Sequence, residues 1–248
     1  MIGFDAALQV ALEAHRRSNK PLAVVLAGHN GSGKSTLWYR HLAETLRIPL
    51  VNADRMMLSI LPEPGDDGFL ADWAANLRDT DESWMRVAQN GVQAFVAQAL
   101  AQGVPFAMET VFSHWVEHTD GAVESKVDLI RQMQAAGYFV LLLFVGLTNE
   151  QVSIGRVATR KDEGGHDVEV RKLVTRFPKT QKAIRHAAPV ADATVFMDNS
   201  RTKKEAFTVV RVQIGSEQRF DIRDVSTGAP AEIAEWMSKT CPDLSQPR

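Results

Sequence analysis

Features that would direct the chain out of a reducing cytosol or into a membrane are scarce. The 248 residues include a single cysteine, Cys241, which cannot form an internal disulfide and fits a reducing compartment. The longest apolar run, 138–146, is about half the length needed to cross a bilayer. The first residues carry no basic stretch ahead of an apolar run, so no secretory signal is expected. We therefore expect a cytoplasmic protein with no membrane contact.

Charge of one sign is equally scarce. Lys and Arg number 28 against 30 Asp and Glu, which gives a net charge of -2. No global attraction to nucleic acid is expected at this charge, and the chain carries no nucleic-acid recognition motif. Hydrophobic residues make up 45% of the chain, enough for a sizeable core. Because no repeat, low-complexity segment or clear linker interrupts it, the chain is predicted to form one domain, 1–248.

A glycine-rich turn between a strand-like run and a helix-like run is the most informative stretch. The turn reads Gly28, His29, Asn30, Gly31, Ser32, Gly33, Lys34, Ser35, Thr36. It fits the pattern G-x-x-x-x-G-K-[ST], in which glycines let several backbone N–H groups point at one phosphate. A chance match is the alternative, but the apolar run 22–27 before the turn and the helical pattern after it argue against that.

This turn predicts ATP and Mg²⁺ as cofactors. Lys34 can place its ammonium between the β- and γ-phosphates, and Ser35 can offer its hydroxyl to the metal. The remaining predicted nucleotide contacts are Gly28, Asn30, Gly31, Ser32, Gly33 and Thr36.

Strand-like and helix-like segments alternate along the chain. Strands are expected at 22–28, 48–54, 104–110, 138–147 and 193–198, with a further strand-like run at 206–214. Helices are expected at 4–17, 34–46, 55–61, 81–102, 121–136, 149–160 and 230–239. This alternation predicts a three-layer α/β fold of the P-loop NTPase or kinase type, with a mostly parallel five- or six-stranded sheet. The run 138–147 is the most apolar and is expected at the centre of the sheet.

Two acids are expected at neighbouring strand ends, where a parallel sheet opens onto a cleft. Asp54 is the candidate general base, able to accept the proton of a substrate hydroxyl. Its alternative role is to cap the helix expected from Arg55. Glu109 can act in the second shell of the metal or bind substrate, and the residues alone do not choose between the two. Thr110, together with Ser113 and His114 in the following loop, can line an acceptor pocket.

A locally basic stretch requires its own explanation. Residues 156–185 hold nine Lys or Arg against four Asp or Glu. Arg156 and Arg160 are four residues apart and share a helix face, and the glycine pair at 164–165 predicts a flexible tip. A lid-like segment at about 156–180 could bring guanidinium groups onto the γ-phosphate, whereas the alternative is a solvated basic face.

Trp73 and Trp84 follow the turn-rich loop 62–68. They could form a stacking platform for a base or sugar, but we expect them to be core anchors.

The ordered set of motifs resembles zeta-toxin-like P-loop kinases over about 21–200. The matching motifs are 28–36, Asn52-Ala-Asp-Arg55, Glu109-Thr110, 156–160, Gly164-Gly-His-Asp-Val168 and Asp198-Asn-Ser200. The resemblance implies an ATP/Mg²⁺-dependent kinase that phosphorylates a hydroxyl of a small molecule. Known members act on UDP-N-acetylglucosamine and are restrained by a small helical antitoxin.

The resemblance also implies roles for individual residues. Asp54 takes the place of the catalytic base, Glu109 and Thr110 lie near the substrate, and Arg156 or Arg160 contacts the ATP phosphates. A second lid arginine of the toxins has no clear counterpart, and His166 is the nearest candidate. Residues 201–248 form a C-terminal extension beyond the match. The competing hypotheses are a nucleotide-binding or hydrolysing switch protein with no small-molecule acceptor, and the toxin of a toxin–antitoxin pair.

Overall fold

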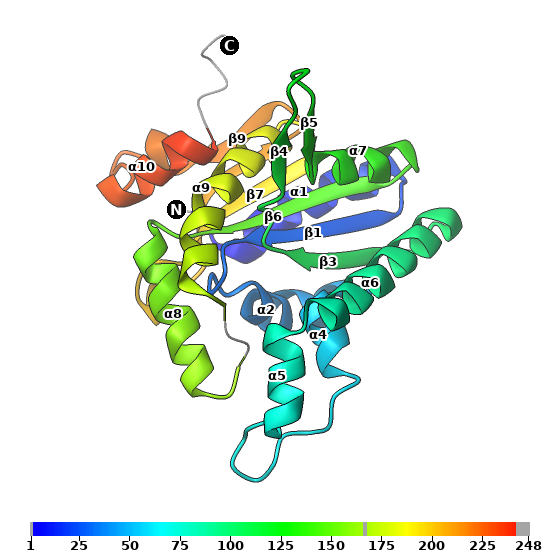
Figure 1. The fold of residues 1–248 in the computed structure, drawn as a ribbon. Coiled ribbons are helices and arrows are strands. Elements are labelled where there is room, and N and C mark those ends of the chain that lie inside the picture. Colours follow the sequence, from blue (N-terminus) through cyan, green and yellow to red (C-terminus); the bar gives the residue numbers. More distant parts are fainter. Residues whose placement is uncertain (1, 166–167, 242–248) are drawn as a thin grey trace.

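The computed structural model describes residues 2–165 and 168–241, which fold into three layers (Figure 1). The middle layer is a seven-stranded sheet in the order β2-β3-β1-β6-β7-β8-β9. The strands from β2 to β7 in that order are parallel, and β8 and β9 are antiparallel. Their bounds are β1 (Leu22–Gly28), β2 (Leu50–Val51), β3 (Phe106–Thr110), β6 (Phe139–Gly146), β7 (Ala193–Asp198), β8 (Thr208–Ile214) and β9 (Glu217–Asp221).

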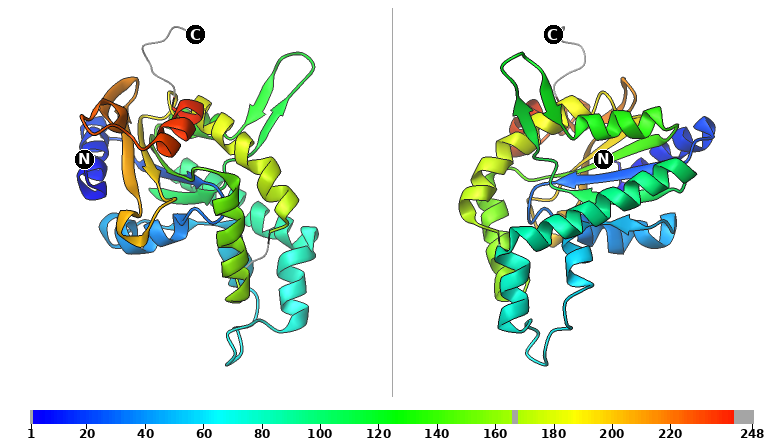
Figure 2. Two further views of the ribbon diagram at one scale, coloured as in Figure 1. Left: turned by 90° about the vertical axis from the view of Figure 1, so that its left-hand side faces the viewer. Right: turned by 45° about the vertical axis from the view of Figure 1, so that its right-hand side comes forward.

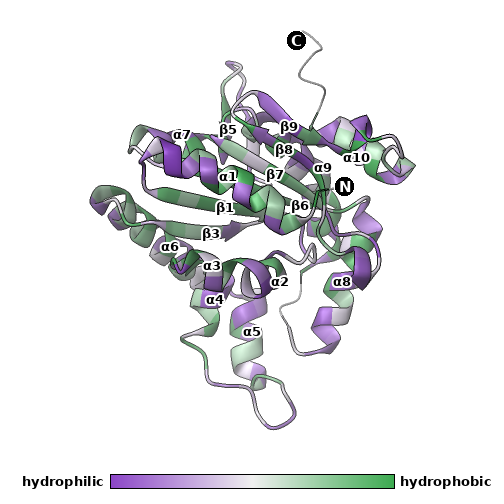
Figure 3. Cartoon of the chain, turned by 180° about the vertical axis from the view of Figure 1, so that it is seen from behind, coloured by the Kyte–Doolittle hydropathy of each residue, from purple (hydrophilic) through white to green (hydrophobic). Residues whose placement is uncertain are grey.

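Helices cover both faces of this sheet. One face carries α6 (Glu82–Gln102), α7 (Val127–Ala135), α9 (Val170–Ala187) and α10 (Ala231–Thr240). The other face carries α1 (Phe4–Ser18) and a helix formed by α2 (Lys34–Leu37), a π-helical turn (Trp38–Leu42) and α3 (Ala43–Leu46) (Figure 3). Away from the sheet lie α4 (Ala53–Leu58), α5 (Asp72–Thr80) and α8 (Glu150–Asp162). Two short 3₁₀ turns span Lys203–Glu205 and Ile222–Asp224.

The core lies on both faces of the sheet because the inner strands are apolar on both sides. In β1, Ala23 and Val25 face the layer of α6, α7, α9 and α10, whereas Val24 and Leu26 face α1 and α2. Strand β6 is buried along its whole length between β1 and β7. The prediction of a central strand at 138–147 is therefore confirmed. Within the described ranges, no helix is both long and apolar enough to cross a membrane.

The expected mostly parallel α/β architecture is confirmed, with seven strands in place of five or six. The run at 206–214 extends the sheet as β8. Within this sheet, the strand missed by the sequence pattern is β9, an edge strand whose residues Glu217, Gln218 and Arg219 are exposed. Polar residues of this kind are typical of an edge strand, which has no second neighbour and one solvated face.

The helix expected at 121–136 is wrong in its first part. An antiparallel hairpin stands there, made of β4 (Trp115–Glu117) and β5 (Val123–Ser125), and α7 begins only at Val127. Gly121 has a φ of 84°, and its N–H donates to the His118 carbonyl at 3.0 Å, which closes the hairpin turn. Figure 2 shows this hairpin projecting from the body of the molecule.

The region of the second strand also differs from expectation. The strand comprises only Leu50–Val51, and α4 spans Ala53–Leu58 in place of 55–61. The Asn52 side chain caps α4, because its Oδ1 accepts hydrogen bonds from the N–H of Asp54 at 2.8 Å and of Arg55 at 3.4 Å. The alternative in which Asp54 is the cap is therefore wrong.

The expectation that two tryptophans anchor the core is wrong as well. Trp73 on α5 is 63% exposed and Trp84 on α6 is 39% exposed. Both helices extend away from the sheet at these positions, so the indole rings do not pack against the sheet.

A buried ion pair joins the last two strands of the sheet. Arg211 on β8 and Asp221 on β9 are almost fully buried, and Arg211 Nη1 lies 3.1 Å from Asp221 Oδ2. Arg223 adds a second contact at 2.6 Å. Burial alone would raise the pKa of Asp221, but hydrogen bonds from Arg223 and the charges of both arginines hold it below its ordinary value.

Replacing this buried carboxylate should destabilise the fold. We expect Asp221→Asn to lower the free energy of unfolding by about 3–5 kcal/mol, because Arg211 is left as an uncompensated buried charge. The difference in stability between wild type and Asp221→Asn should be fully present above pH 3.8, the ordinary pKa of an aspartate. It should shrink as the pH falls through the lower pKa that Asp221 has in the folded protein. Urea unfolding between pH 3 and 7 measures both effects. The control Glu217→Gln, in an exposed pair with Arg219, should change stability by less than about 1 kcal/mol.

Candidate active site

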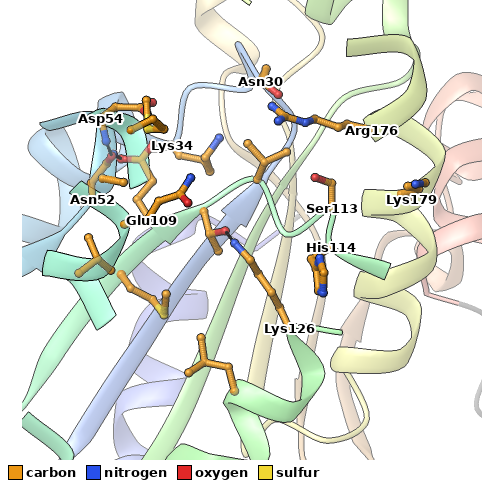
Figure 4. A pocket seen from close by; sticks show the side chains of 18 of the residues that line it. Asn30, Lys34, Asn52, Asp54, Glu109, Ser113, His114, Lys126, Arg176 and Lys179 are labelled. Atoms are coloured by element: carbon orange, nitrogen blue, oxygen red, sulfur yellow. Dashed lines mark hydrogen bonds between the residues drawn. The ribbon is translucent and has the colours of Figure 1, made fainter. Parts of the chain in front are cut away.

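A large cleft opens at the carboxyl ends of β1 and β3. Its volume is about 1450 Å³, and its walls come from the phosphate-binding turn, α4, α6, α7 and α9 (Figure 4). Strand β1 lies between β3 and β6, so the loops that follow these parallel strands meet at one edge of the sheet. Such positions are the usual ligand sites of open α/β sheets.

The turn 28–36, called the phosphate loop from here on, depends on its glycines. Gly31 and Gly33 have φ values of 68° and 91°, in the region that side chains disfavour. A Cβ atom on Gly33 would lie 2.7 Å from Asn199 Nδ2. That amide donates a hydrogen bond to the Ser32 carbonyl at 2.8 Å, so it holds the loop from behind. The loop is thus fixed by contacts that leave no room for larger residues.

Lys34 points into the phosphate loop. Its Nζ donates hydrogen bonds to the carbonyls of Gly28 at 3.1 Å and His29 at 3.0 Å, and its side chain is buried. Burial lowers the pKa of Lys34, as does the charge of Arg160, while Glu109 and Asp54 oppose that shift. The ammonium is therefore desolvated and lies within electrostatic reach of both predicted acids, in a position where it can bind an anion.

Glu109 joins two elements at the base of the cleft. Ser35 Oγ lies 3.0 Å from both of its carboxylate oxygens, and Asn52 Nδ2 donates to Oε2 at 2.9 Å. A hydroxyl and a carboxylate are hard oxygen donors that suit Mg²⁺, which usually retains waters and phosphate oxygens for its other positions. The described residues contain no cluster of three or more His, Cys, Asp or Glu that could hold a metal alone. Ser35 and Glu109 could therefore supply the protein's share of a metal site shared with phosphates.

Asp54 lies on the first turn of α4 and lines the same cleft. Its side chain is exposed, and Figure 4 shows it on the same side of the cleft as Lys34 and Asn52. Since Asn52 serves as the cap, the Asp54 carboxylate is not used in holding the helix end. It is available to a molecule in the cleft.

The two predicted lid arginines lie in different places. Arg160 lines the cleft, whereas Arg156 lies behind the phosphate loop, with Nη1 3.5 Å from the Gly31 carbonyl. Burial lowers the pKa of Arg156, and the charge of Asp198 opposes this. His166 lies outside the described residues.

Helix α9 presents a basic face to the cleft rather than to solvent alone. The residues concerned are Arg171, Lys172, Arg176 and Lys179. His29 of the phosphate loop stacks on Phe177 of this helix, with ring centroids 3.8 Å apart. Burial, and secondarily Lys34, lowers the pKa of His29 to about 3, so the ring is neutral. This stack fixes α9 against the phosphate loop.

Lys126 is a cleft residue that the motifs missed. It precedes α7, and its Nζ donates a hydrogen bond to Thr110 Oγ1, which also accepts from the Phe112 N–H at 3.2 Å. Burial, followed by the charges of Arg176 and Lys34, lowers the pKa of Lys126 to about 8. No local pattern marks this lysine, because its position depends on the hairpin before it.

The far half of the cleft was also not recognised by motif. Helix α6 contributes a mixed apolar and amide wall: Met85, Gln89, Val92, Gln93, Val96, Ala97 and Leu100. Helix α7 adds Leu129 and Gln132. The loop after β3 adds Ser113 and His114, which the sequence already indicates as candidate pocket residues. The amides Gln89 and Gln93 are four residues apart on one helix face, which is the one sequence signal that could have indicated this wall.

Comparison with models of known families finds no match, and comparison with curated proteins finds none either. Solved structures do match. A chain of the PezAT toxin-antitoxin system of Streptococcus pneumoniae is 14% identical, with a TM-score of 0.50 over 96% of this chain and 88% of that one. A chain of the AvrRxo1-ORF1:ORF2 complex with ATP is 16% identical, with a TM-score of 0.59 over 97% and 71%. A chain of the same complex with sulphate ions is 15% identical, with a TM-score of 0.59 over 98% of this chain and 72% of that one.

At these identities the similarity concerns the fold. It confirms the predicted three-layer α/β P-loop fold and, at the level of fold, the resemblance that the ordered motifs indicate.

The Ser35–Glu109 pair predicts nucleotide binding that depends on a metal and that weakens when Glu109 loses its charge. We expect Glu109→Gln to raise the Mg²⁺ concentration needed for binding a fluorescent ATP analogue by about 10- to 100-fold, because the metal loses a charged oxygen neighbour. Glu124→Gln is the matched control, since Glu124 lines the rim of the same cleft. An unchanged Mg²⁺ requirement in Glu109→Gln would contradict the assignment.

Removing the charge of Lys126 should stabilise the fold. Its folded-state pKa of about 8 lies below the ordinary 10.5, so its ammonium costs stability at every pH below 8. We expect Lys126→Met to raise the free energy of unfolding at pH 7 by about 1–3 kcal/mol. The gain should decline between pH 8 and 10.5. Urea titrations at these pH values test this, with the exposed Lys20→Met as control; equal stability of wild type and Lys126→Met at pH 7 would refute it.

Proposed function

We propose that the protein is an ATP/Mg²⁺-dependent kinase that transfers the γ-phosphoryl group of ATP to a hydroxyl of a small molecule. One observation carries this proposal. Lys34 and Glu109, which Ser35 contacts, line the same cleft as residues of α6 and α7. A hydrolase needs room for ATP and water alone, whereas this cleft of about 1450 Å³ has room for a second substrate.

In this proposal the donor half is built on the phosphate loop. Its backbone N–H groups and Lys34 bind the phosphates, and Arg160 approaches from α8. Ser35 and Glu109 would hold Mg²⁺, which when bound neutralises phosphate charge. Arg156 supports the loop from behind through the Gly31 carbonyl.

The acceptor half begins at Asp54. Its carboxylate takes the proton from the acceptor hydroxyl as that oxygen forms a bond to the γ-phosphorus. The bond from phosphorus to the bridging oxygen breaks, and ADP leaves with that electron pair. General-base assistance of this kind is worth about 10²- to 10⁴-fold in rate. The exposed position of Asp54 in the cleft, independent of helix capping, supports this role.

The remaining acceptor contacts come from Thr110, Lys126 and the glutamines of α6. Apolar surface beside amide groups and a lysine suits a ligand that combines an uncharged ring system with an anionic group. UDP-N-acetylglucosamine, implied by the family resemblance, meets this description and is the first acceptor to test. The resemblance and the PezAT fold similarity also support a small antitoxin as partner. We further propose that 1–248 acts as one kinase domain in which 156–180 contacts nucleotide.

Two substitutions test the proposal. Lys34→Ala should abolish ATP consumption, because the desolvated ammonium of the phosphate loop is lost. Asp54→Asn should lower kcat by about 10²- to 10⁴-fold and leave the Kd for ATP within about threefold. The measurement is turnover with a panel of sugar nucleotides, nucleosides and polyols, with products identified by mass.

The control is Asp66→Asn, in the exposed loop before α5, which should retain full activity. A phosphate on any small acceptor supports the kinase. Hydrolysis of ATP unaffected by every acceptor supports the alternative of a nucleotide-dependent switch. Full turnover by Asp54→Asn would show that another group is the base.

A further inference from the structure

Two segments far apart in sequence, α5 and the turn after α8, are joined by hydrogen bonds of Arg78. Arg78 on α5 donates from Nη1 to the Gly164 carbonyl at 3.0 Å and from Nη2 to the Gly165 carbonyl at 3.4 Å. Arg78 and Gly164 are 86 positions apart in the sequence. Figure 1 shows α5 and α8 as separate helices below the sheet, with the turn that follows α8 between them.

The Arg78 guanidinium is held in a fixed orientation. Asp79 accepts from its Nε at 2.8 Å and from its Nη2 at 2.9 Å, and the Arg78 side chain is only 10% exposed. A planar guanidinium can satisfy a carboxylate and two carbonyls at once, which a lysine cannot do. The contact between Arg78 and the turn at 164–165, called the junction from here on, is therefore largely buried and well ordered by hydrogen bonds, unlike an exposed surface pair.

The glycine pair fits this junction closely. Gly164 has a φ of 82°, and a Cβ there would lie 2.8 Å from the Gly68 carbonyl oxygen. A Cβ on Gly165 would lie 2.6 Å from Cγ of Arg160. The Gly165 N–H also donates to the Arg160 carbonyl at 2.9 Å. The glycines thus permit close packing against both α8 and the loop before α5.

The junction bears on the chemistry through Arg160. Arg160 lies near the carboxyl end of α8 and lines the cleft, within electrostatic reach of Lys34. Its backbone is tied to Gly165, and Gly165 is tied to Arg78. Helix α6 packs against both α4, which carries Asp54, and α5, so these three helices lie on the same side of the cleft.

We propose that Arg78 is a positioning residue for phosphoryl transfer, which holds the turn at 164–165 against α5 and thereby holds Arg160 toward the ATP phosphates. This inference rests on the proposed kinase function. It links the acceptor side of the cleft, where α5 belongs, to the donor side, where α8 belongs. Arg78 itself does not line the cleft and acts through Arg160.

The test compares Arg78→Met, Arg160→Met and the double variant. We expect Arg78→Met to lower kcat by about 10- to 100-fold, because misplacement of a charge-stabilising group is costly. The double variant should be no slower than Arg160→Met alone, since both changes remove the same interaction. A purely structural role of Arg78 would give additive losses. Arg86→Met, an exposed arginine on α6, is the control and should keep wild-type kcat.

A second variant approaches the junction from the other side. Gly165→Ala should reproduce the loss of kcat and its non-additivity with Arg160→Met, so the test does not depend on Arg78→Met folding well. Hydrogen exchange of the amides at 160–165 should become faster in Arg78→Met and stay unchanged in Arg86→Met. Hydrogen exchange reports on the contact between Arg78 and the turn at 164–165 independently of activity. If the wild-type protein transferred no phosphoryl group, the proposed function would fail, whereas the exchange result would still show whether Arg78 holds the turn. Unchanged exchange, unchanged kcat or additive losses would overturn the inference.

Discussion

The amide of Asn52 determines the geometry on which the candidate site depends. Its Oδ1 caps α4, and its Nδ2 donates to Glu109 at the end of β3. Glu109 in turn accepts from Ser35 at the end of the phosphate loop. One side chain thereby contacts both the Glu109 carboxylate, which we propose as a metal ligand, and the helix turn that carries Asp54. A single residue with two hydrogen-bonding ends thus links the end of β3 to the start of α4.

Electrostatics within the cleft differ from those of the chain as a whole. The net charge is only -2, yet α9 and Lys126 bring several cations to one cavity. Burial first, and then the charges of Arg176 and Lys34, lower the pKa of Lys126. A bound polyanion would offset the repulsion between these cations, so the charge of the cleft favours anionic ligands. The neutral His29 adds no further charge and serves as packing for α9.

Patterns within one segment could be predicted from the sequence, whereas contacts between segments could not. The phosphate loop and the buried run of β6 follow from local glycine spacing and hydropathy. The cap at Asn52, rather than Asp54, depends on where β2 leaves the sheet. Lys126 enters the cleft only because a hairpin precedes α7, and Trp73 is exposed because α5 leaves the core. For the glycine pair, local composition indicated a flexible tip, whereas the structure shows close packing against Arg160 and Gly68.

The seven-stranded sheet has two open edges, β2 and β9. Strand β2 has two residues, too few to serve as a template for another chain, and β9 displays Glu217 and Arg219 to solvent. Short and charged edge strands oppose pairing between molecules. The apolar interior of β6 and its neighbours is thus enclosed at both lateral ends of the sheet. The polar edge strand β9, which the sequence pattern missed, thus also opposes intermolecular β-pairing of the apolar inner strands.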